Sequence, residues 1–354
     1  MIEMRPKRSW LTRVVAAAAL VVASLVSGTA TSQAEETTIT CNMLVTGTIK
    51  VGNDLTCVDT DALIVASDNV VIDLNGHRIN CIGSGYLGSC QGIAPTGGAV
   101  DEEPEDGVNI TAHINVHVLD TKEGGTIDGF DNAIHIERSQ EVKIEHLTLT
   151  GPPGQVVNPR PFSHGVLIRG STCAGDANIH IGSGQFSGNE MMNHNQGIAI
   201  NGSCVSVVHN IVHHNNSNGS VPSNGILLNQ ASNNVVRGSE VFANGDTVDP
   251  LNQDGGITIR QDSRDNHIVN NRVLSNFGDG ISIRNASVNN FIDNNTMLFN
   301  GGVLLGSEYY DAAGRGAPGE LNKWNQNNQC VTQNQEVPPG VCGPEEAPPM
   351  PSLL

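Results

Sequence analysis

The sequence is poor in aromatic residues: Phe, Trp and Tyr together account for 3% of its 354 residues. Trp324 is the only Trp beyond residue 34, and the three Tyr are Tyr86, Tyr309 and Tyr310. Surfaces that bind sugars usually offer aromatic rings as platforms, because these side chains combine a large apolar face with a polar tip. The shortage therefore counts against a sugar site built from stacked aromatic rings.

Long apolar runs are also missing, with one exception near the start. Residues 14–26 form an apolar run that follows four basic residues and precedes small residues up to Ala34. This is the layout of a secretory signal peptide, so we expect cleavage after Ala34 and an exported protein, periplasmic or extracellular. The alternative is a membrane anchor, but the run is shorter than the ~20 residues that a span needs.

Basic residues are scarce. Without residues 1–34 the chain keeps 14 basic and 35 acidic residues, a formal net charge of −21. This charge argues against nucleic acids and anionic membranes as partners. A polyanionic substrate would need a cation or a local Arg cluster in order to bind.

Several short motifs are absent as well. The sequence has no Gly-x-Ser-x-Gly elbow, phosphate loop, dinucleotide fingerprint or Cys-x-x-Cys pair. The missing Cys-x-x-Cys pair disfavours zinc, although the chain has eight cysteines: Cys41, Cys57, Cys81, Cys90, Cys173, Cys204, Cys330 and Cys342. An even number of cysteines in an exported chain predicts disulfides.

What the sequence does contain is an internal repeat of short strand-like elements. They read NAIHIE (132–137), HGVLIR (164–169), QGIAIN (196–201), NGILLN (224–229), GGITIR (255–260) and DGISIR (279–284). Their apolar residues alternate with outward positions, which is the period of a strand. Units of this size cannot bury a core alone, but they can when stacked in register. The pattern lacks helical periodicity and is too short for propeller blades, so it predicts an all-β parallel β-helix.

Each element is followed by a twelve-residue window, and the windows end at Thr150, Asn189, Asn215, Asn244, Asn276 and Asn300. One apolar column of the windows is Val142, Ile181, Val207, Val236, Ile268 and Ile292, and a second is Leu147, Phe186, Val212, Val241, Val273 and Met297. We expect both columns to point into the core.

The many Asn residues fit the turns between the strands. Asn tolerates left-handed backbone geometry, and identical residues in register can bond to one another as a ladder. We expect Asn210, Asn271 and Asn295 to occupy one corner. A second corner would hold Asn189, Asn215, Asn244, Asn276 and Asn300.

The cysteines agree with stacked turns. Cys173 and Cys204 follow equivalent strands in adjacent turns, which places them ~5–6 Å apart and within disulfide reach. Cys41–Cys57 and Cys81–Cys90 would close the N-terminal end, and Cys330–Cys342 the C-terminal end. The ends need such protection because a solenoid exposes unpaired strand edges there.

At this point the chain resembles the right-handed parallel β-helix, pectate-lyase-like superfamily. It is most similar to bacterial exported proteins with NosD-type β-helix repeats, through the segment DNVVIDLNGHRI (68–79), the NGIxI and DGIxI strands and the Asn-rich windows. The resemblance covers roughly residues 60–300, and the terminal NKWNQNNQC…GVC segment resembles a C-terminal cap. We therefore expect a signal peptide at 1–34, a β-helix domain at 35–325 with an N-terminal cap to about 67, and a C-terminal cap and Pro-rich tail at 326–354. The superfamily includes polysaccharide lyases, hydrolases, uronate epimerases and proteins without known catalysis, so the fold does not choose an activity.

Ligands of this superfamily usually lie along the outer face of one sheet, and the NGIxI face is the candidate here because long insertions precede it. Uronate elimination needs a neutralised carboxylate, a base and a proton donor. We expect His164 as base, Asp254 as orienting group or Ca²⁺ ligand, and Arg260 as carboxylate-binding group. The expected substrate-binding residues are Asn195, Asn224, Asp279 and Arg284.

Several alternatives stay open. Hydrolysis would need two carboxylates, for which Asp254 and Asp279 are the natural pair. Ca²⁺ could bind at Asp246, Asp249 and Asp254, and copper or zinc at the His group His194, His209, His213 and His214. The leading hypothesis is a monomeric protein that binds or processes polysaccharide, with a uronate lyase ahead of a hydrolase. In the lyase, Arg260 and Arg284 would neutralise the substrate carboxylate. The other is a non-catalytic surface or matrix scaffold.

Overall fold

The computed structural model describes residues 35–83, 90, 105–151, 163–173, 179–182, 188–216, 223–245, 255–301, 309–311, 322–325 and 327–330. The chain divides into two units, Met1–Glu35 and Glu36–Leu354, and the second contains all of the strands. The predicted signal peptide, residues 1–34, lies outside the described residues. Within the described residues no helix is present, so none is long and apolar enough to cross a membrane.

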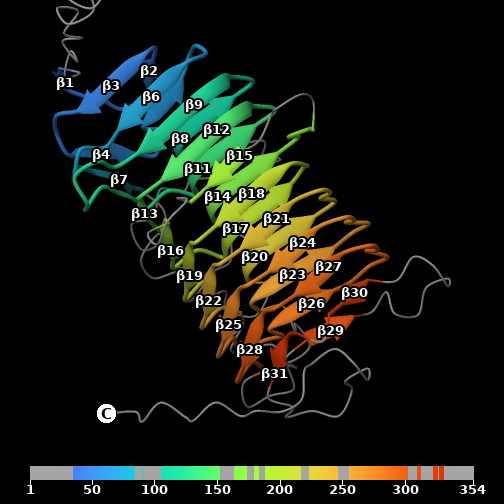
Figure 1. The fold of residues 1–354 in the computed structure, drawn as a ribbon. Helices are drawn as coiled ribbons and strands as arrows, with labels where there is room; N and C mark the ends of the chain where they lie inside the picture. Colours follow the sequence, from blue (N-terminus) through green and yellow to red (C-terminus); the bar gives the residue numbers. More distant parts are fainter. Residues whose placement is uncertain are drawn as a thin grey trace, which may run out of the picture. The chain divides into compact units, whose positions relative to one another are not determined.

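The strands of Glu36–Leu354 form three parallel sheets (Figure 1). Sheet A contains β1 (Glu36–Thr37), β3 (Thr48–Val51), β6 (Val70–Asp73), β9 (Ile114–Leu119), β12 (Gln140–Glu145), β15 (Ile179–Ile181), β18 (Val205–Val208), β21 (Val235–Arg237), β24 (His267–Val269), β27 (Phe291–Asp293) and β30 (Lys323–Trp324).

Sheet B contains β2 (Met43–Val45), β5 (Leu63–Val65), β8 (Asp106–Thr111), β11 (Asn132–Glu137), β14 (His164–Arg169), β17 (Gln196–Asn201), β20 (Asn224–Asn229), β23 (Ile257–Arg260), β26 (Ile281–Ile283) and β29 (Tyr309–Asp311). All six NGIxI-type elements therefore lie in one sheet, as predicted.

Sheet C contains β4 (Leu55–Val58), β7 (Arg78–Ile82), β10 (Thr126–Asp128), β13 (Thr148–Thr150), β16 (Glu190–Met192), β19 (Ile211–His213), β22 (Glu240–Phe242), β25 (Arg272–Leu274), β28 (Thr296–Leu298) and β31 (Gln329–Cys330). Successive strands of the chain visit sheets B, A and C in turn, and each strand pairs with its counterpart one turn away. The predicted parallel β-helix is confirmed.

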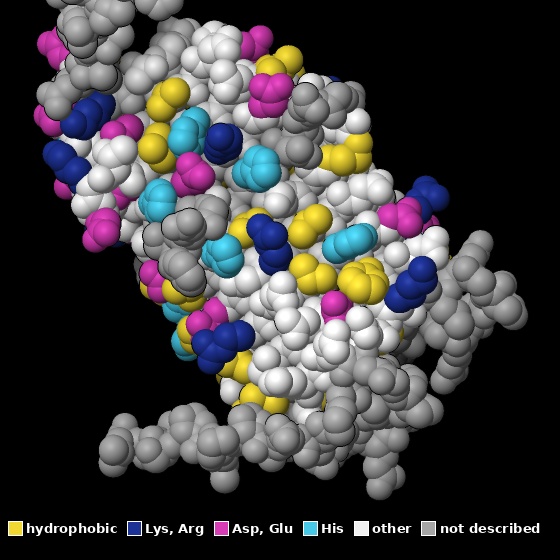
Figure 2. Space-filling view, in the orientation of Figure 1, with side chains coloured by type: hydrophobic (Ala, Val, Ile, Leu, Met, Phe, Trp, Pro, Cys, Tyr) yellow, Lys and Arg dark blue, Asp and Glu magenta, His cyan; other side chains and the backbone are white. Residues whose placement is uncertain are grey.

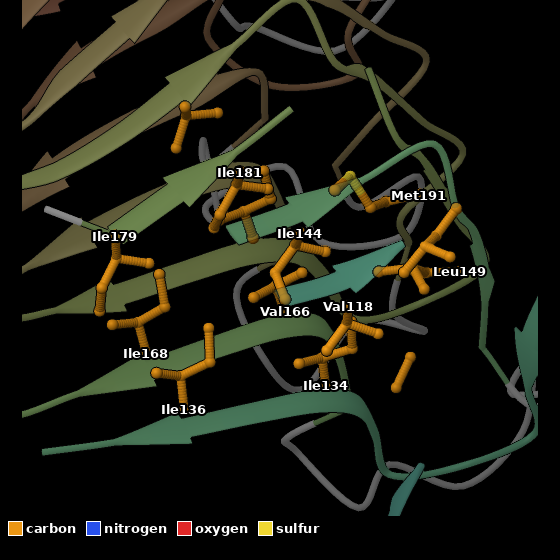
Figure 3. Close-up of a cluster of buried hydrophobic side chains, with 14 of the residues drawn as sticks. Val118, Ile134, Ile136, Ile144, Leu149, Val166, Ile168, Ile179, Ile181 and Met191 are labelled. Carbon is orange, nitrogen blue, oxygen red and sulfur yellow. The ribbon is translucent and has the colours of Figure 1, made fainter. Parts of the chain in front are cut away.

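The core lies between the three sheets and consists of branched aliphatic side chains (Figure 3). From Val207 and Val212 onward both predicted apolar columns are correct, and every member is buried. Before that point the predicted register of the two columns is wrong. Ile144, not Val142, pairs with Ile181, and Leu149, not Leu147, pairs with Met191, which in turn pairs with Val212. Phe186 lies outside the described residues. An ungapped alignment cannot represent a turn that carries extra residues, so it displaced these positions.

Most sheet B elements have glycine at their second position because a side chain there would clash with its neighbours. A Cβ atom on Gly225 would lie 2.6 Å from Cγ1 of Val241 and 2.8 Å from Nδ2 of Asn244. The chain turns inward there, against the side chains of sheet C and the adjoining corner. A larger residue would displace the corner that positions the start of the strand.

Three ladders of buried polar side chains run along the corners. The first contains Asn234, Asn266, Asn290 and Asn322, the second Asn189, Asn210, Ser239, Asn271, Asn295 and Asn328, and the third Asn215, Asn244, Asn276 and Asn300. In a typical rung, Nδ2 of Asn266 donates to Oδ1 of Asn290 at 2.9 Å and to the carbonyl of Ala231 at 2.9 Å. Each rung thus satisfies buried backbone groups that the turn leaves unpaired.

The ladders confirm the expected role of Asn, with two corrections. Asn189 bonds to Asn210, so it belongs to the second ladder and was assigned to the wrong corner. The first ladder was missed entirely. Its residues explain the Asn-Asn pairs of the sequence: Asn289 adopts a φ of 57° at the exposed turn, while Asn290 is buried in the ladder.

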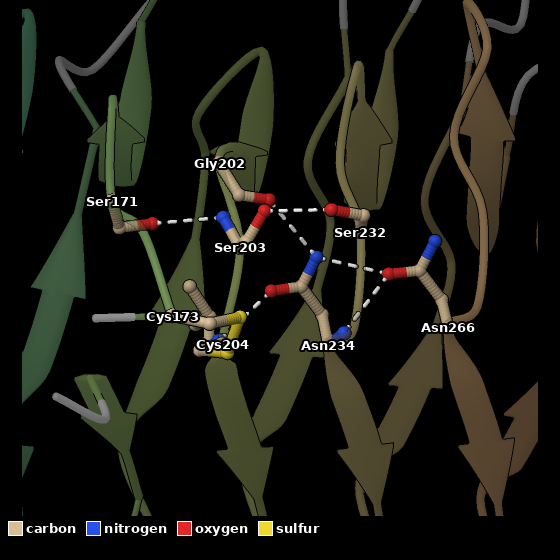
Figure 4. The surroundings of a disulfide bond; sticks show 9 residues. Ser171, Cys173, Gly202, Ser203, Cys204, Ser232, Asn234 and Asn266 are labelled. Carbon is tan, nitrogen blue, oxygen red and sulfur yellow. Dashed lines mark hydrogen bonds between the residues drawn. A yellow bond between two sulfur atoms is a disulfide. The ribbon is translucent and has the colours of Figure 1, made fainter. Parts of the chain in front are cut away.

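The disulfides Cys41–Cys57, Cys81–Cys90 and Cys173–Cys204 are present, with Cα–Cα separations of 5.6, 5.4 and 5.3 Å. Cys173–Cys204 links adjacent turns next to the hydrogen bond between Oγ of Ser203 and Ser232 (Figure 4). Cys330 is also disulfide-bonded. Its predicted partner Cys342 lies outside the described residues, so that pairing and the cap and tail boundaries stay predictions.

Candidate functional site

The outer face of sheet B carries two buried rows that run along successive turns. The outer row is His135, Leu167, Ala199, Leu227, Thr258 and Ser282, and the leading row is Asp106, Asn132, His164, Gln196 and Asn224. All of these residues, including Leu167 and Leu227, are 7% exposed or less. The long insertions that precede this face, residues 151–163 and 245–253, lie largely outside the described residues.

Asp106 and His135 form a buried pair at the N-terminal end of these rows. Oδ2 of Asp106 lies 2.9 Å from Nδ1 of His135 and also accepts from Nδ2 of Asn109 at 2.9 Å. Its Oδ1 accepts from Nδ2 of Asn132 at 2.8 Å. Because a carboxylate can only accept here, the neutral imidazole carries its proton on Nδ1. Asp106 therefore fixes both the tautomer and the orientation of the His135 ring.

The other nitrogen of this ring has no such contact. Nε2 of His135 is buried and has no hydrogen-bond partner among the described residues. With the proton on Nδ1, Nε2 presents a lone pair, which is the arrangement of a general base held by a carboxylate. A buried acceptor without a partner costs stability, so a native fold retains one where a ligand completes it.

Carboxylates gather next to this pair. Asp59 and Asp61 precede β5, Glu105 directly precedes Asp106 in β8, and Asp131 precedes β11; we call these five residues the acidic corner. Burial, followed by the charges of Asp61 and Asp131 and then of the other two carboxylates, raises the pKa of Glu105 to about 7. A carboxyl group with this pKa can deliver a proton at neutral pH.

His164, the base expected from the sequence, lies one strand further along. Its Nδ1 donates to Oδ1 of Asn132 at 2.7 Å, and the ring is 4% exposed. Burial, followed by the charges of His194 and Arg169, lowers its pKa to about 3, so the ring is neutral at physiological pH. Its contact with Asn132 ties it to the Asp106–His135 pair.

The other expected catalytic residues do not share a turn with His164. Arg260 is on β23, three strands from β14, which corresponds to about 14 Å between strands. Nε of Arg260 donates to Oδ1 of Asn229 at 3.3 Å. Asp254 lies outside the described residues, so its expected role stays a prediction.

Asp279 and Arg284, expected to bind substrate, are paired with each other. Nη2 of Arg284 donates to Oδ2 of Asp279 at 2.8 Å, and Asp279 is 1% exposed. The Arg284 charge is thus balanced within its own turn. A carboxylate of a substrate would have to compete with Asp279 for this guanidinium group.

Asn195 and Asn224 are both buried in the leading part of the face. Oδ1 of Asn195 and Nδ2 of Asn224 have no hydrogen-bond partner among the described residues. Oδ1 of Asn224 accepts from Oγ1 of Thr258 at 2.5 Å. One unfilled acceptor and one unfilled donor lie near the outer row, where hydroxyl groups of a ligand could use them.

Among the histidines considered for metal binding, the ring of His213 has other partners, whereas the ring of His194 is buried and neither of its nitrogens has a hydrogen-bond partner among the described residues. Nε2 of His213 lies 2.9 Å from Oε1 of Glu190, and its ring stacks on Phe242. His194 occupies the first position of the third ladder, where its backbone N–H donates to Oδ1 of Asn215. The described residues contain no group of three His, Cys, Asp or Glu that could hold a metal ion. The Ca²⁺ prediction rests on Asp246, Asp249 and Asp254, which lie outside this part of the chain.

The outer face of sheet A has a different character. In Figure 2, which has the orientation of Figure 1, basic, acidic, histidine and apolar side chains alternate across the front of the molecule. Nε2 of His117 bonds to Oε2 of Glu145 at 2.7 Å, and Lys143 pairs in register with His180. These partly exposed, mixed charges are typical of a solvated face, so sheet B remains the candidate.

The sequence interpretation missed Asp106 and Glu105 because they precede the first repeat that was aligned. A signal was present: DGVNIT (106–111) has the same form as DGISIR (279–284). Aligning it would have placed Asp106 beside Asn132, as the structure does.

The comparisons with known proteins agree with this architecture. The family model described as "Right handed beta helix region" matches residues 132–312, and the chain belongs to this family. No curated protein sequence matches the chain.

Among solved structures, the periplasmic alginate epimerase AlgG is similar with a TM-score of 0.51 and 13% identity, covering 82% of this chain and 61% of that one. The tailspike protein of E. coli bacteriophage HK620 follows at 0.38 and 12%, covering 94% and 64%. The Azotobacter vinelandii mannuronan C-5 epimerase AlgE6 A-module has a TM-score of 0.35 and 10% identity, covering 85% of each chain. The chain thus spans less than two thirds of the first two structures, and at these identities the likeness concerns the fold.

Proposed function

We propose that this protein is exported, binds a polysaccharide along the outer face of sheet B, and processes it at an acid–base centre formed by Asp106, His135 and Glu105. The observation that carries the proposal is the buried Nε2 of His135, which has no partner among the described residues while Asp106 holds Nδ1 at 2.9 Å. The three disulfides support export, because such bonds persist in oxidising compartments.

A polysaccharide fits the shape and chemistry of this face. The rows run along the stacking direction, so a linear polymer can contact successive turns through repeated polar groups. Asn195 and Asn224 contribute an unfilled acceptor and donor to that path. AlgG and the HK620 tailspike share the fold, and one tailspike structure is a complex with a pentasaccharide.

Two reactions use a positioned base on such a polymer. Uronate elimination, which the sequence suggested, also needs a cation at the carboxylate. Arg260 and Arg284 lie four or more strands from β11 and are engaged by Asn229 and Asp279. Residues 105–111 and 131–137 contain no Lys or Arg.

Hydrolysis of a glycosidic bond needs a protonated acid beside a second acid–base group. Glu105, whose pKa is raised to about 7, suits the first role because it retains a proton near neutral pH. His135 or a neighbouring carboxylate suits the second, because each can accept a proton from the attacking water. The described residues therefore favour hydrolysis over uronate elimination.

The second candidate function is a non-catalytic scaffold. It is favoured by the C-terminal part of the outer row, where Oγ1 of Thr258 bonds to Asn224 and lies 3.1 Å from Oγ of Ser282. These groups satisfy one another within the fold, as a purely structural row would. A scaffold, however, gives no reason for an unfilled Nε2 on His135.

The two functions are separated by assaying the purified protein on neutral, acidic and amino polysaccharides. Hydrolysis is read as new reducing ends, and elimination as the ultraviolet absorbance of an unsaturated product. We expect reducing ends, and we expect His135→Gln to lower turnover by about 10²–10⁴-fold. His267→Gln, on the exposed face of sheet A, is the matched control and should retain full activity. Equal turnover by both variants, or no product from any polymer, would overturn the catalytic proposal.

A further inference from the structure

A chain of hydrogen bonds crosses three adjacent strands of sheet B, β8, β11 and β14 (Figure 1). Nδ2 of Asn132 donates to Oδ1 of Asp106 at 2.8 Å, and Oδ1 of Asn132 lies 2.7 Å from Nδ1 of His164. Oδ2 of Asp106 lies 2.9 Å from Nδ1 of His135. One carboxylate therefore reaches two imidazole rings, His135 directly and His164 through an amide.

The four side chains of this hydrogen-bond chain are buried. Their exposed fractions are 0% for Asn132, 1% for Asp106, 4% for His164 and 7% for His135. Water therefore has little access to these hydrogen bonds, and a buried polar group without its partner costs stability. Each donor in the chain must face an acceptor, so the amide of Asn132 has one favourable orientation.

The direction of each hydrogen bond follows from the carboxylate of Asp106. A carboxylate can only accept, so Asn132 turns its NH₂ group toward it, and the oxygen of the same amide faces His164. Burial lowers the pKa of His164 to about 3, so the neutral ring carries one proton, and the amide oxygen requires that proton on Nδ1. The ring also has a side-chain hydrogen bond with Gln196, whose amide can serve either tautomer and so does not decide between them.

We infer that Asn132 is a positioning residue of the acid–base centre: its amide carries the orientation set by Asp106 to His164, so one carboxylate fixes the tautomers of two imidazoles. The inference rests on the proposed function, because it assigns a role at the same centre. Asn132 and Asn109 each donate to one oxygen of Asp106. With both oxygens held, the carboxylate cannot rotate away from His135 when that ring takes up a proton.

The first test determines both tautomers in the wild-type protein. Long-range nitrogen–proton NMR correlation on protein labelled with ¹⁵N-histidine, at alkaline pH, shows which ring nitrogen carries the proton. We expect the proton on Nδ1 in both His135 and His164. His117 is the internal reference, because its Nε2 lies 2.7 Å from a carboxylate oxygen of Glu145 and must carry the proton there. A proton on Nε2 of His164 would overturn the inference.

Asp106→Asn tests the transmission, because an amide has one accepting and one donating end where a carboxylate has two accepting oxygens. Two donors, Nδ2 of Asn109 and Nδ1 of His135, face the Oδ2 position, and only Nδ2 of Asn132 faces the Oδ1 position. We therefore expect the new oxygen to keep the two donors and the new NH₂ group to face Asn132. The amide of Asn132 then turns round, and His164 moves its proton to Nε2 while His135 keeps its proton on Nδ1.

The control for this variant is Asp262→Asn, the same substitution at an exposed turn far along the chain, which should change neither tautomer. A switch of only one ring in Asp106→Asn supports the inference, because a single amide cannot serve both rings as the carboxylate does. Unchanged tautomers in both His135 and His164 would contradict it, since the orientation of Asp106 would then not reach His164.

Asn132→Leu breaks the hydrogen-bond chain in the middle and leaves Asp106 in place. His164 loses the oxygen that holds its proton on Nδ1, so its tautomer should change while that of His135 does not. On a polysaccharide that the protein hydrolyses, we expect kcat to fall by about tenfold to 100-fold with KM unchanged, because Asn132 orients the base without touching substrate. The matched control is Asn201→Leu, at a partly exposed position of β17, which should leave kcat and both tautomers unchanged.

The outcomes distinguish this inference from the proposed function. If turnover depends on His135 but Asn132→Leu retains it in full, the function stands and the positioning role of Asn132 fails. If the tautomers respond as expected but no polymer is processed, the coupling of the two imidazoles stands and the catalytic proposal fails. Thermal unfolding of each variant shows that it is folded.

Discussion

The turns of residues 105–196 and those of residues 205–301 bury polar side chains in different ways. In the later turns the corner ladders bury mainly Asn side chains that bond to the identical side chain one turn away, as Asn266 does with Asn290, and the buried carboxylate of Asp279 is paired with Arg284. In the earlier turns they are titratable: Asp106, His135, His164 and His194 are all 7% exposed or less. The ladders of the later turns satisfy their amide groups by repetition, whereas the earlier turns leave Nε2 of His135 and both ring nitrogens of His194 unfilled.

The comparison teaches which part of the solenoid is framework. An uncharged amide that donates and accepts along one axis can repeat without limit, because each rung completes the one before it. A carboxylate or imidazole cannot repeat in this way, since neighbouring copies repel or compete for one proton. Buried titratable groups whose polar atoms have no partner are therefore the positions at which to look for a departure from a purely structural role.

The largest effect should come from breaking a ladder. Asn290→Ala removes the oxygen that accepts from N and Nδ2 of Asn266, and the nitrogen that donates to Asn322. Because buried donors lose their partners, we expect the free energy of unfolding to fall by about 3 kcal/mol. Urea unfolding of the disulfide-bonded protein, followed by circular dichroism, measures the loss.

The neighbouring residue provides the control. Asn289 is exposed with a φ of 57°, a conformation that glycine adopts freely. Asn289→Gly should therefore change the free energy of unfolding by only a few tenths of a kcal/mol. Similar losses in the two variants would show that the ladder contributes nothing beyond the turn itself.

The next prediction concerns the dependence of the free energy of unfolding on pH. Burial is the main cause that lowers the pKa of His164 and of His194 from 6.5 to about 3. The unfolded chain then binds more protons than the folded one between these values, so stability is complete above about pH 6.5 and decreases as the pH falls toward 3. Unfolding measured across this range should show the decrease.

His194→Asn connects this behaviour to the ladder. The substitution places an amide at the head of the third ladder, above Asn215, and removes one of the two titrating groups. We expect a shallower pH dependence and a gain of about 1 kcal/mol at acidic pH. His267→Asn, at an exposed position, should leave the slope unchanged. An equally steep slope in His194→Asn would mean that other groups cause the acid sensitivity.

The smallest expected effect is that of Glu105 on stability, and its dependence on pH is opposite to that of His164 and His194. The pKa of Glu105 is raised from 4.5 to about 7, so the folded protein holds this proton more tightly and its contribution is lost as the pH rises through this range. Glu105→Gln should be more stable than the wild type above pH 7, by less than about 1 kcal/mol because the group is partly exposed. It should show no gain below pH 4.5, and neither should Glu141→Gln at any pH. A gain that is independent of pH would refute the assignment.

The later turns were predictable because their repeat is strict. Val236, Ile268 and Ile292 share a column in the sequence and in the structure, since consecutive windows differ only in their connecting segments. The same method misplaced Asn189 and Val142, because the earlier turns carry extra residues that break the register. Spacing alone cannot reveal where within a turn the extra residues lie.

The candidate site was less predictable than the fold. His164 was placed on the outer face of sheet B from the sequence, but Asp106 became visible only when β8 was placed beside β11. The burial that shifts the pKa values of Glu105 and His164 has no sequence signature, because it depends on packing against residues distant along the chain. Arg260 and Arg284 illustrate the converse: their spacing suggested a carboxylate site, while Asp279 and Asn229 supply partners that spacing could not show.

The most direct test of the account is the tautomer of His135. Long-range nitrogen–proton NMR correlation on protein labelled with ¹⁵N-histidine, at alkaline pH where imidazoles are neutral, identifies which ring nitrogen carries the proton. We predict that the proton is on Nδ1, donated to Asp106, and that Nε2 is an unprotonated acceptor. A proton found on Nε2 would contradict the account, because that nitrogen could then no longer serve as the base.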